Sequence, residues 1–213
     1  MTAEVNTNRT ANLTANLTAN LVASTTASGT ADSPTVGGHA FVPVRGLHHF
    51  AYRCRDAEET RRFYEDLLGL PLVHLIQEDH VPSTGEYCPY VHVFFEMGDG
   101  SFIAFFDLGD DQASDPSPNT PSWVNHLALK VGSPELVRQA KQRLEEAGVD
   151  VVGVTDHGFI QSIYFFDPNG IRLELTAQIG ETPDDAGERR RTRARLDEWT
   201  ARKEAARKRQ ETA

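Results

Sequence analysis

One sequence pattern occurs twice in this chain, and the internal repeat constrains the fold more than any other feature. Residues 47–73, LHHFAYRCRDAEETRRFYEDLLGLPLV, align with residues 124–152, VNHLALKVGSPELVRQAKQRLEEAGVDVV. The alignment places His49 over His126. Each copy reads as a strand, a turn, an amphipathic helix and a terminating glycine, and three further strands follow it. The order βαβββ, used twice, predicts an α+β domain of two modules whose sheets curl around one shared cleft.

The two modules are predicted at residues 45–108 and 123–178. The first helix begins near Asp56, a suitable N-cap, and ends at Gly69. The second begins near Ser133, with proline at the first helical position, and ends at Gly148. The Asp-Pro-Asn-Gly sequence at 167–170 predicts a hairpin turn between the last two strands. The predicted strands after the helices are Val73–Ile76, Val91–Glu96, Ser101–Phe106, Val151–Val154, Ser162–Phe166 and Ile171–Thr176.

The two ends of the chain differ in composition from this domain. Residues 1–40 are rich in Thr, Ala and Asn and carry no core-forming pattern, which predicts a disordered segment. Residues 181–213 are highly charged and predict a solvated helix or tail, docked by Leu196 and Trp199, with an arm for a partner or for RNA as the alternative. The folded domain is therefore expected at 41–180.

Composition excludes several classes of function. The chain has 31 acidic and 21 basic residues, a formal charge of −10, and the basic C-terminal segment leaves the body still more acidic. This argues against a core that binds nucleic acid. No apolar stretch reaches membrane-spanning length. The two cysteines, Cys54 and Cys88, cannot form a disulfide framework and favour reduced thiols in a cytoplasmic protein.

Strand alternation groups three candidate metal ligands on one side of the sheets. His49, His126 and Glu174 each alternate with the apolar residues of their strand, so they occupy the opposite face. If the apolar faces meet the helices, all three side chains enter the cleft. A single histidine in such a place is usually structural, but two at equivalent positions of a repeat, with a carboxylate, indicate a divalent metal site. Two imidazoles and one carboxylate are typical of non-haem iron(II) oxygenases, and manganese or zinc also fits.

Over residues 45–178 this pattern resembles the vicinal oxygen chelate superfamily. That superfamily includes glyoxalases, fosfomycin-resistance transferases, bleomycin-resistance proteins and extradiol ring-cleaving dioxygenases. The resemblance implies two βαβββ modules that bind a divalent metal in the sheet cleft, with His49, His126 and Glu174 as ligands. Glyoxalase-type members add a fourth ligand on the last strand of the first module, where this chain has Ala104. That difference disfavours a glyoxalase.

Residues 156–174, DHGFIQSIYFFDPNGIRLE, are similar to the signature of the extradiol dioxygenase branch. The similarity implies that His157 and Tyr164 lie near the metal-bound oxygens of the substrate. Extradiol enzymes also carry an acid–base histidine just after the last strand of the first module, where this chain has Asp107. A carboxylate has a much lower ordinary pKa than histidine. We therefore expect either Asp107 or His92, on the neighbouring strand, to take the acid–base role.

The resemblance implies a non-haem Fe(II)-dependent extradiol-type dioxygenase, active on a catechol-like or other vicinal-oxygen small molecule with O₂, as in the breakdown of aromatic compounds. A homodimer is a further expectation, because many relatives are dimers. Two alternatives remain open. One is a metal-dependent lyase, isomerase or fosfomycin-type transferase, which the His157–Tyr164 pair disfavours. The other is a metal-free binding protein of the bleomycin-resistance kind, which the three candidate ligands disfavour.

Overall fold

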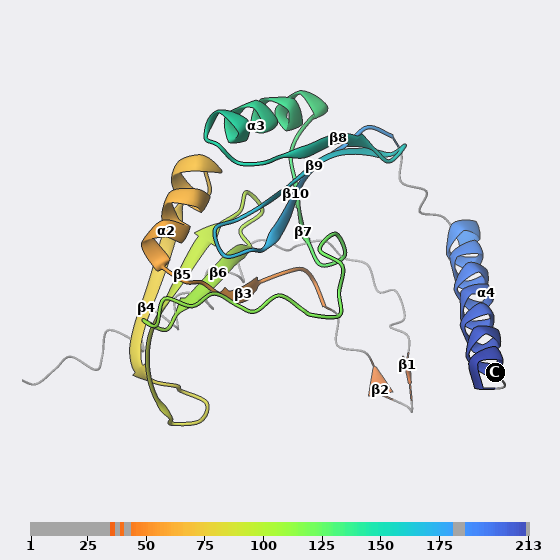
Figure 1. Ribbon diagram of the computed structural model, residues 1–213, viewed down its shortest axis with the longest axis horizontal. Coiled ribbons are helices and arrows are strands. Elements are labelled where there is room, and N and C mark those ends of the chain that lie inside the picture. The colour runs from red at the N-terminus through yellow and green to blue at the C-terminus, as the bar shows by residue number, and fades with distance from the viewer. Residues whose placement is uncertain (1–34, 37–38, 41–43, 181–185, 212–213) are drawn as a thin grey trace, which may run out of the picture. The chain divides into compact units, whose positions relative to one another are not determined.

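The computed structural model describes residues 35–36, 39–40, 44–180 and 186–211 (Figure 1). The chain divides into two units, Met1–Gly46 and Leu47–Ala213. In the first unit, β1 (Thr35–Val36) and β2 (His39–Ala40) form a short antiparallel pair. The expectation that residues 1–40 are disordered otherwise falls outside the described residues. In the part that is described, no helix is both long and apolar enough to cross a membrane.

The first module is a four-stranded mixed sheet with one helical segment. Its strands are β3 (His49–Arg53), β4 (Leu72–His80), β5 (Tyr87–Glu96) and β6 (Phe102–Asp107), in the order β3-β6-β5-β4. The strand β3 runs parallel to β6, and the other neighbours are antiparallel. Helix α2 (Ala57–Arg61) continues as a π-helical turn, η1 (Arg62–Leu67). Asp56 caps α2 as predicted, because its side chain accepts the Glu59 N–H at 2.6 Å.

The second module repeats this arrangement. Its elements are β7 (Leu127–Lys130), α3 (Pro134–Glu146), β8 (Val152–Asp156), β9 (Ile160–Phe166) and β10 (Arg172–Gln178). The strand order is β7-β10-β9-β8, with β7 parallel to β10, so the topology matches that of the first sheet. Ser133 caps α3 by accepting the Leu136 N–H. The predicted α+β fold of two βαβββ modules is confirmed, and the two sheets remain separate four-stranded sheets.

One hydrophobic core joins the two modules. It combines the inner faces of both sheets with the helical segments, and the rings of Phe63 in η1 and Phe165 in β9 lie 6.2 Å apart. Alternation then places the candidate site residues on the other faces of the sheets. In β10, Leu173 and Leu175 belong to the core, and Glu174 between them pairs with Tyr164 of β9 on the opposite face. The predicted strand parity is therefore confirmed for the second module.

A buried carboxylate ties the second hairpin to the helical segment of the first module. Asp167 accepts the Tyr64 hydroxyl proton at 3.0 Å and the Ile171 N–H at 2.7 Å. The side chain of Asn169, in the same turn, donates to Thr60 in α2 at 3.1 Å and accepts the Arg55 N–H at 2.9 Å. Burial raises the pKa of the Asp167 carboxyl above its ordinary value. The bonds to Tyr64, Thr60 and Arg55 connect residues more than 100 positions apart and set how the two modules meet.

The C-terminal segment contains one helix, α4 (Ala186–Glu211). Leu196 and Trp199 are each about half exposed in it, at 52% and 53%. The docking role expected for these two side chains is therefore not seen in the structure. Both cysteines are free thiols, and burial raises the pKa of Cys54 to about 11.

We predict that Asp167→Ala destabilises the protein by about 3 kcal/mol, because several buried donors lose their acceptor at once. The free energy of unfolding from urea titration measures this loss. Asp150→Ala, at an exposed position, is the matched control and should change stability by less than about 0.5 kcal/mol. Equal effects of the two substitutions would show that the turn does not hold the modules together.

Candidate metal centre

The second module brings two of the three predicted ligands together. His126 precedes β7 and Glu174 lies in β10, and the His126 Nε2 atom is 3.1 Å from Glu174 Oε2. The Glu174 side chain is only 5% exposed, whereas that of His126 is 34% exposed. A buried carboxylate requires a nearby positive charge or several hydrogen-bond donors. The His126 ring and the Tyr164 hydroxyl are the side-chain groups that contact this carboxylate.

The hydrogen bonds of His126 identify which of its ring nitrogens carries a proton and which one faces the Glu174 carboxylate. Its Nδ1 atom is 3.0 Å from the Val124 carbonyl oxygen, and a carbonyl can only accept, so Nδ1 carries a proton. In the neutral ring, Nε2 then presents a lone pair toward Glu174. A lone pair and a carboxylate at 3.1 Å repel each other unless a proton or a cation lies between them. A histidine oriented by a backbone carbonyl is also the usual form of a metal ligand.

A line of hydrogen bonds extends from Glu174 to His157. The Tyr164 hydroxyl donates to Glu174 Oε1 at 3.2 Å and lies 2.8 Å from His157 Nε2. Burial, and after it the charge of Glu174, raises the pKa of Tyr164, so the phenol remains protonated at neutral pH. Because its O–H group donates to Glu174, the Tyr164 oxygen can accept a hydrogen bond from the N–H of His157 Nε2. The predicted residues His157 and Tyr164 therefore both belong to the surroundings of Glu174.

The third predicted ligand, His49, lies in β3 of the first module. Its ring makes edge contacts with His92 and Phe94, with ring centroids 6.1 Å and 5.6 Å apart. His49 Nδ1 lies 2.6 Å from His48 Nδ1, which leaves Nε2 as the ring nitrogen available to a ligand. Burial and then the neighbouring His48 lower the pKa of His49. The ring is therefore neutral at pH 7, as a metal ligand must be.

His92 is the most enclosed histidine of this face. It is 7% exposed, its ring stacks on Phe106 with centroids 3.7 Å apart, and its Nε2 atom is buried without a hydrogen-bond partner. Burial, with smaller effects from His49 and His74, lowers its pKa to about 4. His92 is thus a neutral imidazole beside a candidate metal ligand, which is compatible with the predicted acid–base role.

Asp107 does not share this face. It follows Ile103 and Phe105 on the core side of β6, whereas His92 pairs with Phe106 on the other side. Its Oδ2 atom accepts the Ala57 N–H at the start of α2, and its Oδ1 atom accepts the Gly109 N–H, both at 2.8 Å. These bonds give Asp107 a structural role in the loop and helix start. Strand parity within the segment 102–107 was the signal that could have separated it from His92.

The three predicted ligands do not meet at one point in the described part of a single chain. No group of three or more His, Cys, Asp or Glu side chains there is close enough to hold a metal ion. One chain therefore presents two partial sites, His126 with Glu174 on one sheet and His49 on the other. The donor set itself, two imidazole nitrogens and a carboxylate, fits a divalent transition metal.

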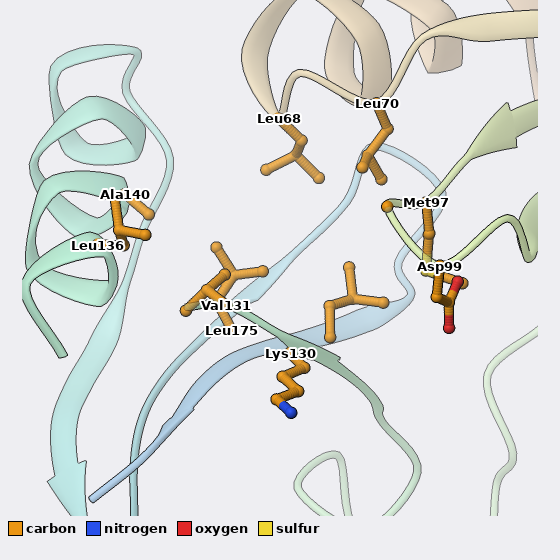
Figure 2. Close-up of a pocket in the computed structure, with 11 residues that line it drawn as sticks. Leu68, Leu70, Met97, Asp99, Lys130, Val131, Leu136, Ala140 and Leu175 are labelled. Atoms are coloured by element: carbon orange, nitrogen blue, oxygen red, sulfur yellow. The ribbon is translucent and has the colours of Figure 1, made fainter. Parts of the chain in front are cut away.

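Two other features near the candidate centre were not expected from sequence. Arg172 lies two residues before Glu174, and its guanidinium carbon is 4.7 Å from the centroid of the Tyr164 ring. An apolar cavity of about 470 Å³ opens on the core side of the sheets, between Leu68 and Leu70 of the first module and Leu136 and Leu175 of the second (Figure 2). Because Leu175 and Glu174 point to opposite faces of β10, this cavity is separate from the candidate metal centre.

Comparisons with known proteins find relatives for the part of the chain that contains both modules. The model of the Glyoxalase/Bleomycin resistance protein/Dioxygenase superfamily matches residues 46–175, well over half of the chain. The chain is 28% identical over 137 residues to "Uncharacterized protein YwkD" of Bacillus subtilis (strain 168), covering 63% of this chain and 98% of YwkD. It is 28% identical over 139 residues to "Putative ring-cleaving dioxygenase MhqA" of the same organism, covering 64% of this chain but only 41% of MhqA. It is 29% identical over 133 residues to "Glutathione transferase FosA" of Serratia marcescens, covering 62% of this chain and 80% of FosA.

Solved structures with the same kind of fold include a glyoxalase/dioxygenase from Nostoc punctiforme. It is 24% identical, with a TM-score of 0.48 and coverage of 70% of this chain and 99% of that chain. The fosfomycin resistance protein FosX from Listeria monocytogenes, in complex with Mn(II), is 20% identical, with a TM-score of 0.46 and coverage of 62% and 92%. Both TM-scores are below 0.5, so family membership rests on the family model.

We predict that Tyr164→Phe weakens the affinity for a divalent metal by about tenfold to a hundredfold, because Glu174 loses the hydroxyl that orients it. Equilibrium dialysis against Mn(II) measures the dissociation constant. Tyr87→Phe, at a 70% exposed position in β5, is the matched control and should leave the affinity unchanged. Unaltered affinity in Tyr164→Phe would mean that the Tyr164–Glu174 bond has no part in metal binding.

Proposed function

Because the chain belongs to the Glyoxalase/Bleomycin resistance protein/Dioxygenase superfamily, we propose that it is a metal-dependent extradiol-type dioxygenase. Its proposed substrate is a catechol-like or other vicinal-oxygen small molecule, which it cleaves with O₂. The observation that carries this proposal is the line of hydrogen bonds from His157 through Tyr164 to Glu174, beside His126. It combines a candidate metal ligand with two groups that can exchange protons with a bound oxygen atom.

The proposed metal is Fe(II), held by His126, Glu174 and His49, where His49 comes from a second copy of the chain. Mn(II) or Zn(II) fits the same donors. When bound, iron supplies Lewis acidity and a path for electrons between the organic substrate and O₂. The protein residues around it hold and move protons. Tyr164 keeps its phenol proton at neutral pH and can donate it to a substrate oxygen, and His157 Nε2 is placed to return a proton to the Tyr164 oxygen.

We assign the missing ligand to a second copy of the chain. In each module the histidine lies at the start of an edge strand, β3 in one sheet and β7 in the other. Edge strands leave one row of backbone donors and acceptors unpaired and are common sites of association. A twofold axis that places β3 of one copy beside β7 of the other would bring His49 of each copy to His126 and Glu174 of its partner. Such a dimer contains two equivalent sites.

Two relatives support different reactions. MhqA is named for ring cleavage and FosA for glutathione transfer, and the chain matches 80% of FosA but 41% of MhqA. Thiol addition by a fosfomycin-type transferase is therefore the second candidate. The His157–Tyr164 pair favours the dioxygenase, because it supplies a proton relay beside Glu174. The donor set disfavours a metal-free binding protein. We further propose a cytoplasmic location, since Cys54 and Cys88 are both free thiols.

We predict that anaerobically purified, Fe(II)-loaded protein consumes O₂ with at least one member of a panel of catechols and other vicinal diols. An oxygen electrode and the absorbance of the ring-opened product measure the reaction. His157→Ala should lower turnover by about 10²-fold while the metal content stays the same, because proton transfer is lost and the metal donors are not. His80→Ala, at an exposed position in β4, is the control. Thiol addition or isomerisation under argon, with no O₂ uptake across the panel, would establish the second candidate instead.

We predict that two inactive variants complement each other if the site spans two copies. His49→Ala and Glu174→Ala, each prepared alone, should bind almost no metal. When they are co-expressed with different tags and the mixed dimer is isolated, one site retains all its ligands, so the metal content should reach about half of the wild-type value per dimer. Metal analysis of the tandem-purified dimer measures this. A mixed dimer without metal would place all three ligands of a site within one copy.

A further inference from the structure

Arg172 is a cation on the metal-facing side of β10 without an anionic partner. It shares a face with Glu174, two residues along the strand, and its guanidinium lies over the Tyr164 ring at 4.7 Å. Its Nε atom is buried and has no hydrogen-bond partner. Among the residues that the structure describes, no carboxylate forms an ion pair with Arg172.

Within residues 47–180, every other arginine has a described partner. Arg53 pairs with Asp110, and Arg55, Arg61, Arg62 and Arg138 pair with glutamates on their own helices or loops. Arg143 donates to the backbone carbonyls of Asp66 and Leu67. A buried N–H group without an acceptor destabilises a fold, so it is normally satisfied by protein, water or a ligand. Arg172 thus differs from these arginines in lacking an anionic or carbonyl partner for its guanidinium, and a ligand with an acceptor group would supply one.

Arg172 also lines a cavity of a size that suits a small molecule. The cavity has a volume of about 400 Å³ and is bordered by Tyr52, Phe166, Arg172 and the connection 114–122. Asn125, the residue before His126, borders it too, so the cavity is lined by close sequence neighbours of both His126 and Glu174. Asp115 is its other charged residue, and it forms no described ion pair with Arg172.

We propose that Arg172 binds a carboxylate group of the substrate and so selects an anionic vicinal diol over a neutral one. The planar guanidinium presents two parallel N–H donors that match the two oxygens of a carboxylate. The Tyr164 ring fixes the plane of the guanidinium from one side, which favours this bidentate contact. Alternate residues of a strand are separated by about 7 Å, so one small molecule can reach both Arg172 and the ligands at Glu174. The position of the diol at that site rests on the proposed function, whereas the carboxylate contact rests on Arg172 alone.

The test is a comparison of three ligands that differ in charge. 3,4-Dihydroxybenzoate carries the carboxylate, 3,4-dihydroxybenzamide is its neutral isostere, and catechol lacks the group. Calorimetry under argon, with and without added Mn(II), measures their dissociation constants. We expect the wild-type protein to bind the benzoate about tenfold to a hundredfold more tightly than the benzamide, the usual effect of a charge-assisted hydrogen-bond pair. A fourth ligand, 3,4-dihydroxyphenylphosphonate, distinguishes a planar carboxylate site from a general oxyanion site.

Variants of Arg172 test whether this side chain causes the preference for the benzoate. Arg172→Gln should abolish the preference for the benzoate, and Arg172→Lys should retain part of it, because a lysine keeps the charge but not the planar fork. Arg138→Gln, which removes an exposed guanidinium on α3, is the matched control and should retain the full preference. Metal affinity should stay the same in all three variants. Urea unfolding checks that each variant is folded.

Equal binding of benzoate and benzamide by the wild-type protein would overturn the proposal without any variant. A preference that survives in folded Arg172→Gln, or tighter binding of the phosphonate than of the benzoate, would overturn it as well. The outcome is separable from that of the proposed function. An Arg172-dependent preference in a protein that never consumes O₂ supports the carboxylate contact and rejects the dioxygenase. If the protein instead cleaves catechol and the benzamide as readily as the benzoate, the dioxygenase is supported and the carboxylate contact is rejected.

Discussion

The buried carboxylate of Asp167 is the interaction on which the arrangement of the two modules depends. It accepts hydrogen bonds from the Tyr64 hydroxyl in the first module and from the Ile171 N–H, just before β10, in the second. One side chain therefore controls both the contact between the modules and the position where β10 begins. Because side chains alternate along a strand, that position decides that Leu173 and Leu175 enter the core and that Arg172 and Glu174 face away from it.

The features that follow from local physics could be predicted from sequence. The caps at Asp56 and Ser133, the hairpin turn at 167–170 and the face on which Glu174 lies all depend on residues within a few positions of one another. The bonds between Asp167 and Tyr64, and the meeting of His126 with Glu174, depend on how distant segments pack. Sequence indicated that His49, His126 and Glu174 each lie on the face of their strand that is opposite the apolar residues. It could not indicate whether those faces meet within one chain. The acid–base role expected of Asp107 or His92 stays a prediction, and parity in β6 places the Asp107 side chain on the core side, away from His92.

The candidate centre shows how a few hydrogen bonds can prepare a site for a cation. The Val124 carbonyl fixes the tautomer of His126, Tyr164 orients Glu174, and His157 in turn contacts Tyr164. Each contact removes an alternative orientation of a side chain before any ligand binds, which lowers the entropic cost of binding. The aromatic face around His92 has a different character, because its imidazole is enclosed by Phe94 and Phe106 and is kept neutral. In the proposed dimer, the aromatic face of one copy, with His49, would lie beside the polar, proton-exchanging face of the other.

Because His49 is separated from His126 and Glu174, metal binding and dimer formation would be linked equilibria. If the complete ligand set exists only in the dimer, every metal ion that binds also stabilises the association of two chains, and dilution of the protein must release metal. Apparent metal affinity would then rise with protein concentration, as would thermal stability in the presence of the metal. A chain of this kind would couple its activity to its own abundance, with little occupied site at low expression and a steep gain once the dimer forms.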